Sequence, residues 1–297
     1  MAIREDGYTK LFKFISYTII VVASLASLLP FLLIISASLT SNDAITKYGY
    51  HFIPTEFSLE GYRMVFRFPQ DVLRAYGVTA SVTVVGTLLG LLCMTMAGYV
   101  LSRKDFKARN VFSFYIYFTT LFGGGLVPWY ILITKYLGWM DSFKALIVPS
   151  LMSPFLIILM KNFIKSAVPE ELFESAKIDG AGNFRIYWQI VLKLAMPGIA
   201  TVALFLALHY WNDWFSSSMF INDTHKYQLQ FYLYNVINSS NFMAQMGVST
   251  GVSLSGDLPS ESMKMAMAIV VTGPILFLYP FIQRYFVKGL TIGAVKG

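Results

Sequence analysis

Six long apolar stretches, separated by polar connections, divide the chain along most of its length. A membrane hydrocarbon core of about 30 Å is crossed by about 20 apolar residues in an α-helix. Lipid offers no partners to backbone amides and carbonyls, so each stretch is expected to be helical. The chain is therefore predicted to be an all-α membrane protein with six transmembrane helices. Their approximate ranges are 14–37, 77–100, 111–133, 145–163, 197–216 and 267–287.

Glycine and proline residues interrupt several of these stretches. Membrane helices tolerate such residues where neighbouring helices cover the break in backbone hydrogen bonding. Each stretch is therefore still expected to form one span. The interrupting residues are Gly123, Gly124, Gly125, Pro128, Pro154 and Pro274.

The composition indicates a surface that faces lipid. Of the 297 residues, 56% are hydrophobic and only 13% are charged, whereas soluble domains carry about 25% charged residues. Cys93 has no second cysteine with which to form a disulfide or a cysteine metal site. Residues 1–13 are polar and basic, and the apolar run after them is longer than the core of a signal peptide. We expect a cytoplasmic N-terminus at 1–13 and an uncleaved six-helix domain over 14–297.

The distribution of lysine and arginine predicts the orientation. One set of connecting segments holds 15 of the 23 basic residues, with the flanking Lys161 and Arg284 included, and the opposite set holds 8. Cytoplasmic loops are enriched in lysine and arginine, so the richer set and both termini are predicted to be cytoplasmic. This arrangement accounts for the net charge of +7 without a nucleic-acid-binding patch. The cytoplasmic connections are then 101–110 and 164–196, and the outer ones are 38–76, 134–144 and 217–266.

The cytoplasmic segment 164–196 is too polar for a membrane span, and its pattern predicts two helical pieces. The first begins at Pro169, which suits a first helical position, and it ends at Asp179 and Gly180. The second follows Asn183, a suitable N-cap residue, and Pro197 opens the next membrane helix. The apolar positions of the second piece recur on one helical face, and they are Phe184, Tyr187, Trp188, Val191 and Leu192. This pattern alone fits equally well a compact docking element and a helix lying on the membrane surface.

The same segment carries a motif with fixed spacing. Glu174-Ser175-Ala176 is followed after three residues by Gly180, and after nine more by Ile190 and Leu192. This spacing resembles the EAA motif of ABC importer permeases. Ser175 replaces an alanine of that motif, and Lys193 stands where the family often has proline.

Other segments extend the resemblance over nearly the whole chain, towards carbohydrate-uptake permeases. The branch that they resemble handles complex oligosaccharides and polysaccharide fragments, and it includes the second permease of alginate importers. The segments are Phe52-Ile53-Pro54, Ser58 to Tyr62, Gly124 to Pro128, and the ending from Tyr285 to Gly297.

The resemblance implies a type I ABC importer permease in a bacterial cell (inner) membrane. Such a subunit pairs with a homologous second permease in the lipid bilayer. Two ATPase subunits bind ATP and Mg, and an extracytoplasmic solute-binding protein delivers the oligosaccharide. The chain has no GxxxxGK[ST] phosphate loop, and it is expected to bind no cofactor or metal and to be non-catalytic.

The resemblance also implies that the motif docks into a cleft on one ATPase subunit. Glu174 would pair with a basic group of the ATPase, and Ala176 and Gly180 would permit close approach of the backbones. Leu172, Phe173 and Ile178 would supply a buried anchor of the kind that interfaces need. The expected coupling residues are Glu174, Ser175, Ala176, Lys177, Ile178, Asp179 and Gly180.

Polar and aromatic residues at membrane depth are candidates for the substrate pathway. An aromatic face with nearby amide or carboxylate groups suits a sugar ring, but Trp and Tyr also gather at both membrane interfaces. Both interpretations stay open for Trp129, Tyr130, Trp211, Asn212, Asp213 and Trp214. The histidines His51, His209 and His225 show no metal-ligand spacing.

Three other functions are alternatives to a sugar importer. An ABC permease for a non-sugar solute would carry the same motif. An ATP-independent secondary transporter leaves the docking segment without a purpose, and a membrane-bound enzyme lacks a visible catalytic set. The outward basic residues Arg63, Arg67 and Arg74 suit an acidic oligosaccharide such as alginate.

Overall fold

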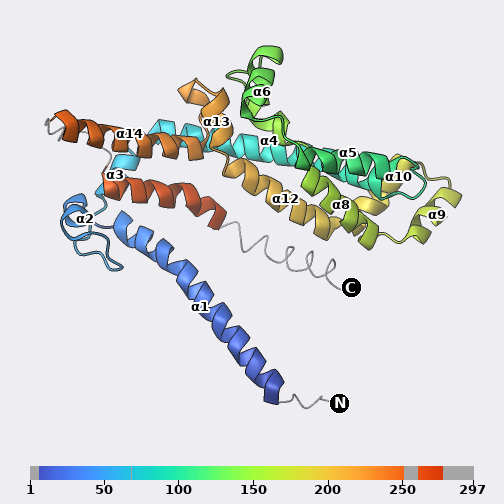
Figure 1. The fold of residues 1–297 in the computed structure, drawn as a ribbon, viewed down its shortest axis with the longest axis horizontal. Helices are drawn as coiled ribbons and strands as arrows, with labels where there is room; N and C mark the ends of the chain where they lie inside the picture. Colours follow the sequence, from blue (N-terminus) through green and yellow to red (C-terminus); the bar gives the residue numbers. More distant parts are fainter. Residues whose placement is uncertain (1–6, 68, 251–259, 277–297) are drawn as a thin grey trace. The chain divides into compact units, whose positions relative to one another are not determined.

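The computed structural model describes residues 7–67, 69–250 and 260–276, without the side chains of 240–250. These residues are helical, and they include no strand beyond an isolated antiparallel bridge between Thr40 and Phe57 (Figure 1). The all-helical part of the expected fold is confirmed.

Contacts divide the chain into two units. The first unit comprises residues 1–69 and 235–273, and the second comprises 70–234 and 274–297. Each unit has its own packing, which is described separately below.

The first unit is built on α1 (Gly7–Ser38), a single helix with a mean hydropathy of 2.7 over its most apolar window. Almost every side chain of α1 is exposed, and burial begins only at its last turn, from Ser36 to Ser38. A long apolar helix with exposed side chains is what a lipid-facing span requires. This helix corresponds to the first predicted span.

The remainder of the first unit joins the segment after α1 to the helix of residues 261–276. The segment contains α2 (Asn42–Tyr48) and α3 (Glu60–Val65). The Tyr50 hydroxyl donates to Glu261 Oε2 at 2.9 Å, and a Cβ on Gly61 would lie 2.6 Å from the Ser262 carbonyl oxygen. The predicted outer segment 38–76 is thus partly helical and packs closely on the start of the last described helix.

The second unit is arranged around α4 (Pro69–Ser102), a helix of 34 residues. Its small and apolar residues are buried at every fourth position, including Val82, Gly86, Gly90 and Met94. This spacing places them on one face, where α8 and α12 pack. The other α-helices of this unit are α5 (Arg109–Leu121), α6 (Leu126–Ile131), α7 (Phe143–Ile147), α8 (Pro154–Ala167), α9 (Glu170–Ile178), α10 (Asn183–Ile186), α11 (Leu192–Leu194), α12 (Met196–Trp211) and α13 (Phe215–Phe220). The helix α14 (Leu229–Thr250) begins in this unit, which ends at residue 234, and its remainder belongs to the first unit.

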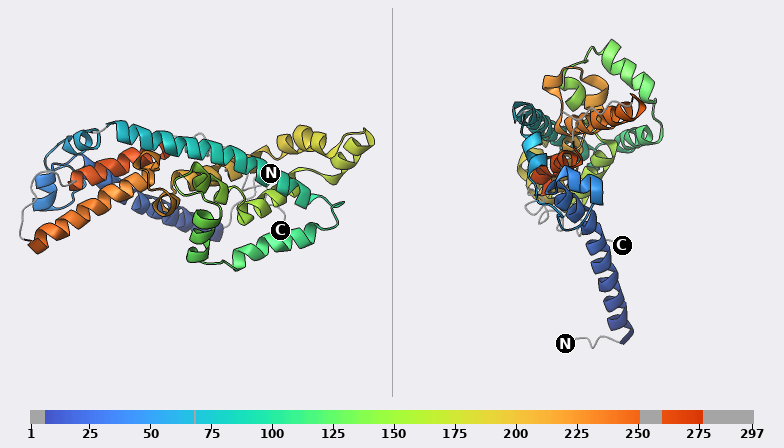
Figure 2. Two further views of the ribbon diagram at one scale, coloured as in Figure 1. Left: turned by 90° about the horizontal axis from the view of Figure 1, so that it is seen from above. Right: turned by 90° about the vertical axis from the view of Figure 1, so that its left-hand side faces the viewer.

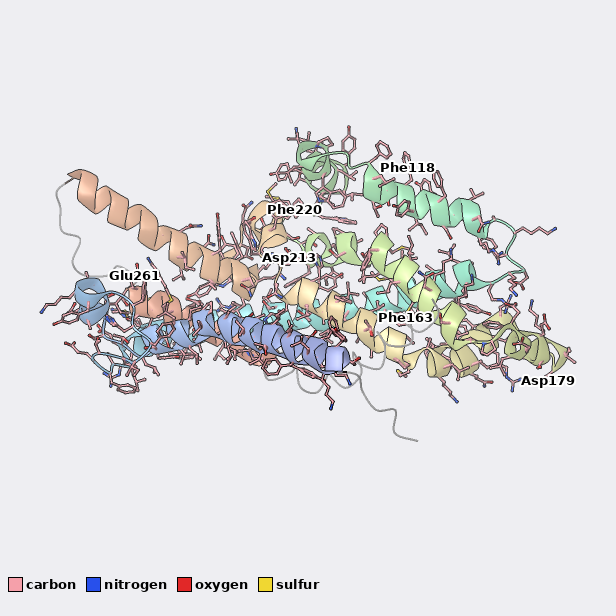
Figure 3. The ribbon with its side chains drawn as sticks, turned by 60° about the horizontal axis from the view of Figure 1, so that its bottom comes forward. Phe118, Phe163, Asp179, Asp213, Phe220 and Glu261 are labelled. Atoms are coloured by element: carbon pink, nitrogen blue, oxygen red, sulfur yellow. The ribbon has the colours of Figure 1, made fainter. Side chains whose placement is uncertain are left out.

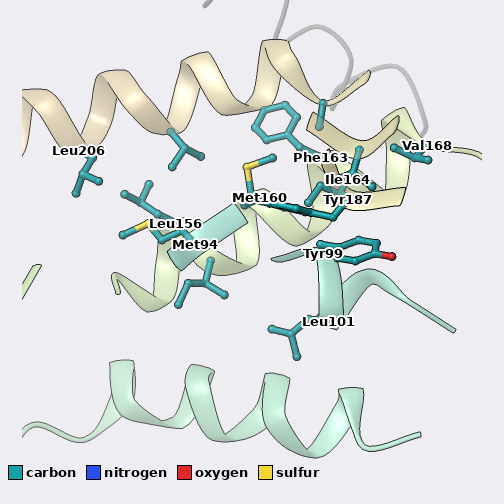
Figure 4. Packing of buried hydrophobic residues seen from close by; sticks show 14 of the residues in the cluster. Met94, Tyr99, Leu101, Leu156, Met160, Phe163, Ile164, Val168, Tyr187 and Leu206 are labelled. Atoms are coloured by element: carbon teal, nitrogen blue, oxygen red, sulfur yellow. The ribbon is translucent and has the colours of Figure 1, made fainter. Parts of the chain in front are cut away.

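Close helix contacts in this core depend on glycine. A Cβ at Gly86 would lie 2.5 Å from the ring of Tyr210, and a Cβ at Gly198 would lie 2.6 Å from Phe163 Cγ. Around them, Met94, Met160 and Leu206 are almost completely buried (Figure 4). Small residues let membrane helices approach closely, and the gain is van der Waals contact rather than water exclusion.

The number of spans differs from the simple expectation. Among the described residues, α1 and α4 are each long and apolar enough to cross a membrane, and three bent helix pairs raise the number to at most five. The sixth predicted stretch, 267–287, is described only up to residue 276, within a helix that begins at 261. Six spans and cytoplasmic termini therefore stay predictions.

The stretch 111–133 is not one helix, so that expectation was wrong. The chain turns by 111° between α5 and the helical segment Leu126–Tyr136 (Figure 2). Three consecutive glycines, of which Gly125 has φ of +86°, remove the helix between them. The next helix, α6, begins at Leu126, and Pro128 lies in its first turn, where proline is tolerated.

Two other boundaries also differ. The stretch 145–163 bends by 46° between Phe143–Ser150 and Pro154–Ala167. The fifth stretch was expected to reach 216, but α12 ends at Trp211. Within the predicted outer loop 217–266, the chain forms most of α13 and all of α14. The stretch 249–260 is rich in Ser and Gly, a composition typical of a flexible loop, and most of it lies outside the described residues.

We predict that Gly198→Ala lowers the melting temperature of the detergent-solubilised chain, followed by circular dichroism. The added methyl meets Phe163 near its backbone, and overpacking of this kind costs about 1–3 kcal/mol. Gly77→Ala is the matched control, because a Cβ at this helical glycine has nothing within 4 Å. Equal melting temperatures for both variants would contradict the proposed close contact.

Candidate functional site

The helix–turn–helix element of residues 169–195 begins one residue later than the sequence predicts, because Pro169 is the N-cap of α9 rather than its first residue. Pro169 precedes α9, Glu170 and Glu171 occupy its first turn, and the helix ends at Ile178. Gly180 has φ of +76°, a conformation that favours glycine. The Ala181 N–H then donates to the Ala176 carbonyl at 2.9 Å, which closes the turn.

The second half of the element differs from the expected regular helix. Asn183 is the first residue of α10, and Gly182 rather than Asn183 occupies the N-cap position without a side-chain cap. A π-helical turn, Tyr187–Val191, follows and leads into α11. A π-turn closes its hydrogen bonds over five residues, so it shifts which side chains face inward.

This shift changes the predicted apolar face. Tyr187 and Val191 are buried, as expected, but Phe184 and Trp188 are 69% and 57% exposed. The Phe184 and Trp188 rings stack on each other with their centroids 6.4 Å apart. The predicted single face is therefore divided into a buried side and an exposed aromatic side.

Two of the expected docking residues contact their own chain instead. Phe173 is only 4% exposed and lies 6.1 Å, centroid to centroid, from Tyr99 on α4. The Ala176 side chain is also buried in the core of the second unit. Neither can serve as an anchor in a partner, whereas Ile178, which is 86% exposed, is free to do so.

Arg103, directly after α4, holds the element in place. Its side chain is only 7% exposed and lies 4.1 Å above the centroid of the Phe173 ring. Its Nε and Nη2 donate to the two carboxylate oxygens of Asp105, each at 3.1 Å, and Nη1 lies 3.9 Å from Glu170 Oε1. The sequence indicated Arg103 only as a marker of the cytoplasmic side, because Glu170 and Phe173, which it contacts on α9, are distant in sequence.

Asp105 extends this network to the expected coupling residue Lys177. Lys177 Nζ lies 2.5 Å from Asp105 Oδ2. The Arg103 and Lys177 hydrogen bonds lower the pKa of Asp105 from 3.8 to about 2. A carboxyl group whose pKa is lowered by folding stabilises the folded state at pH values above its ordinary pKa, which is 3.8 here. This stabilisation is lost as the pH falls from that value through the folded pKa of about 2. The network is therefore ionised at physiological pH.

Aromatic and hydroxyl contacts fix the second half of the element to α4 as well. The hydroxyl groups of Thr95 and Tyr187 lie 2.7 Å apart, and the Tyr99 and Tyr187 rings have centroids 5.7 Å apart (Figure 4). Beside them is a cleft of about 270 Å³. Its lining residues are Tyr99, Val100, Arg103, Asp105, Phe106 and Asn183.

The residues predicted to line a pathway lie well away from this element, as the labels of Asp179 and Asp213 show (Figure 3). Trp129 and Tyr130 are on α6, where Trp129 is 38% exposed and the Tyr130 ring stacks on Phe220 with centroids 6.1 Å apart. The other four residues follow one another at the end of α12 and the start of α13. The candidates therefore form two groups on separate segments of the chain, α6 and the junction of α12 with α13.

In the second group, two residues are occupied by local structure. Trp211 is only 9% exposed and packs on Tyr76, with centroids 6.3 Å apart. Asp213 Oδ1 accepts the Ser216 N–H at 2.9 Å, which caps the start of α13.

The other two residues of this group are exposed and meet partners that sequence reasoning missed. Asn212 Oδ1 accepts a hydrogen bond from Gln230 Nε2 at 3.2 Å. The Trp214 ring, 41% exposed, stacks on Tyr234 at 4.7 Å between centroids. Gln230 and Tyr234 belong to α14, which the sequence pattern did not identify as a helix.

The family of the chain follows from comparison with known proteins. The family described as "binding-protein-dependent transport system inner membrane component" matches residues 86–292. The chain belongs to this family. It is therefore a transport permease and an inner-membrane component of a transport system.

Relatives extend the match over the whole permease. A Bacillus subtilis polygalacturonan/rhamnogalacturonan transport system permease protein, YtcP, is 37% identical over 288 residues, or 97% of this chain and 99% of the relative. Protein LplC of the same organism is 39% identical over 91% of this chain and 90% of its own length. The crystal structure of a bacterial ABC transporter that imports the acidic polysaccharide alginate matches with a TM-score of 0.80 at 27% identity. That match covers 96% of this chain and 100% of the other.

We predict that Arg103→Met loosens the element and exposes it to trypsin at Lys177 or Arg185. Loss of a hydrogen bond to a charged group costs about 1.5–3 kcal/mol, so cleavage should be about tenfold faster or more. Lys104→Met is the matched control, since Lys104 Nζ lies 4.0 Å from Glu170 Oε2 but its side chain is 67% exposed, and an exposed ion pair contributes little stability. Equal cleavage rates for the two variants would contradict the role of Arg103.

Proposed function

We propose that the permease forms half of the translocation pathway of an ATP-driven importer for an oligosaccharide. A homologous second permease completes the pathway. Two ATPase subunits bind ATP and Mg and hydrolyse the ATP, and an extracytoplasmic solute-binding protein delivers the sugar. The observation that supports this proposal most directly is the helix–turn–helix element, which presents an exposed tip and is fixed at its base to α4.

The tip of the element is the docking surface for one ATPase subunit. Glu174, Ser175 and Asp179 are exposed, and Ile178 is the most exposed apolar residue beside them. An exposed apolar side chain surrounded by polar groups is a suitable interface anchor. Ala176 and Lys177, which also belong to the motif, hold the tip to its own chain, while Gly180 forms the turn.

The contacts at the base transmit the movement. Arg103 and Tyr99 join α9 to the end of α4, and Tyr187 joins the second half of the element to the same helix. When the ATPase subunits close on ATP, the element moves and carries the end of α4 with it. Rigid-body motion of this kind alternates access to a binding site between the two sides of the membrane.

The substrate class rests on the relatives. Their names refer to polygalacturonan, rhamnogalacturonan and alginate transport. An acidic oligosaccharide such as alginate is one candidate, and an ABC permease for a non-sugar solute is the alternative. Arg74, one of the outward basic residues, is already engaged by Asp71 and His225, which leaves less free positive charge than the sequence suggests.

Within the pathway, Asn212 and Trp214 are the strongest candidates for sugar contact. Both are exposed, and they combine an amide with an aromatic face, as a sugar ring requires. Trp129 and Tyr130 form a second candidate surface on α6. Trp211 and Asp213 contribute by fixing the backbone on which the adjacent residues Asn212 and Trp214 are carried.

We predict that Ile178→Asp uncouples the reconstituted importer. Sugar uptake into vesicles should fall at least tenfold, whereas the permease still inserts and pairs, because Ile178 contacts nothing in its own core. Ile178→Leu should transport normally. Normal uptake by Ile178→Asp would exclude the docking role of the tip, and failure of any ATPase to co-purify with the unmodified permease would exclude the importer itself.

A further inference from the structure

The second half of the helix–turn–helix element has an orientation set by the helix that follows. The helical segment Asn183–Leu194 meets Met196–Trp211 at 82°. A transmembrane helix is tilted on average by about 20° from the bilayer normal. If α12 crosses the membrane, residues 183–194 therefore run close to the membrane plane, at the level where the span begins.

The side chains of this segment form three separate rows. Ile186, Tyr187 and Val191 are buried in the core of the second unit. Phe184 and Trp188 form an exposed, stacked aromatic row. The third row is polar and contains Arg185, Gln189 and Lys193, in which Arg185 Nε donates to Gln189 Oε1 at 3.0 Å.

Exposed apolar surface continues from this segment into the membrane helix. Leu194 and Met196 are 42% and 51% exposed at the junction with α12. The chain contains no acidic residue from 180 to 212. The segment is therefore apolar and basic at the depth where lipid headgroups lie.

We propose that residues 183–194 form an interfacial helix that binds anionic phospholipid of the cytoplasmic leaflet. Phe184 and Trp188 insert at the headgroup level, where aromatic residues gather. Arg185 and Lys193 attract the headgroups, and each basic residue near an anionic surface contributes about 1 kcal/mol. The lipid surface thus supports the coupling element from the side opposite to its own core. The cytoplasmic assignment rests on the proposed function.

The experiment uses spin labels in the complete importer, reconstituted in phosphatidylcholine nanodiscs with and without phosphatidylglycerol. The single cysteine is removed by Cys93→Ala, and labels are attached at Trp188→Cys or, as a matched exposed position, at Ile178→Cys. Collision rates with oxygen, which is enriched in lipid, and with a nickel chelate, which is enriched in water, report the surroundings of each label. Phe184→Cys replaces Trp188→Cys if that variant does not assemble.

We expect the ratio of oxygen to nickel collisions at position 188 to exceed that at position 178 several-fold when the ATPase subunits are absent, and the ratio at 188 to stay the same when they bind. A label at 188 that is accessible to nickel when the ATPase is absent and becomes shielded only when it binds would overturn the proposal in favour of protein contact. If 178 is never shielded by the ATPase, the docking role fails while the lipid contact at 188 still stands.

A second measurement tests the charges. Arg185→Gln with Lys193→Gln should remove the gain in uptake that phosphatidylglycerol gives over phosphatidylcholine alone. Lys165→Gln, which removes an exposed charge from α8, should retain that gain. Retention of the full gain by the double variant would refute binding of anionic headgroups by this helix.

Discussion

The ion-pair and aromatic contacts of Arg103 determine how the helix–turn–helix element is held to the end of α4. A guanidinium that is 93% buried must be paired, because an isolated buried charge is strongly unfavourable. Asp105 accepts two hydrogen bonds from it, Glu170 Oε1 lies 3.9 Å from Nη1, and the centroid of the Phe173 ring lies 4.1 Å from the guanidinium carbon. Nη1 itself makes no hydrogen bond within the described residues. Because Glu170 and Phe173 belong to α9, the buried charge ties the helix–turn–helix element to the longest helix of the second unit.

This constraint also explains why the motif residues divide into two sets. Ala176 is buried and Lys177, although exposed, is paired with Asp105, so both hold the element to its own chain. Glu174, Ile178 and Asp179, in contrast, are exposed and unengaged by that network. A coupling device needs both properties, since a tip without a rigid base would move without moving the membrane helices. The exposed aromatic row of Phe184 and Trp188 adds a third contact, which the lipid surface is suited to provide.

The sequence predicted the features that depend on local chemistry. Pro169 and Gly180 flank α9, and the first five apolar runs coincide with α1, with α4 and with three bent helix pairs. It did not predict the break at Gly123–Gly125, because the same glycines are compatible with a covered helix. The burial of Phe173 and the role of Arg103 depend on contacts between residues about 70 or more positions apart. The π-turn after Ile186 shifts the helical register, and a regular apolar period does not predict such a shift. Asp213 was a pathway candidate by composition alone, and its hydrogen bond to Ser216 shows it capping a helix.

The central claim is that the element and the end of α4 move as one body. The most direct test measures the distance between spin labels at Lys107, in the loop after α4, and Glu171 on α9, both of which are exposed, in the Cys93→Ala importer. We predict one narrow distance distribution that is the same in the nucleotide-free and ATP-bound complexes, and that broadens when Arg103 is replaced by methionine. A distance that changes by several ångströms between the two nucleotide states would show that the element moves independently of α4 and would contradict the account.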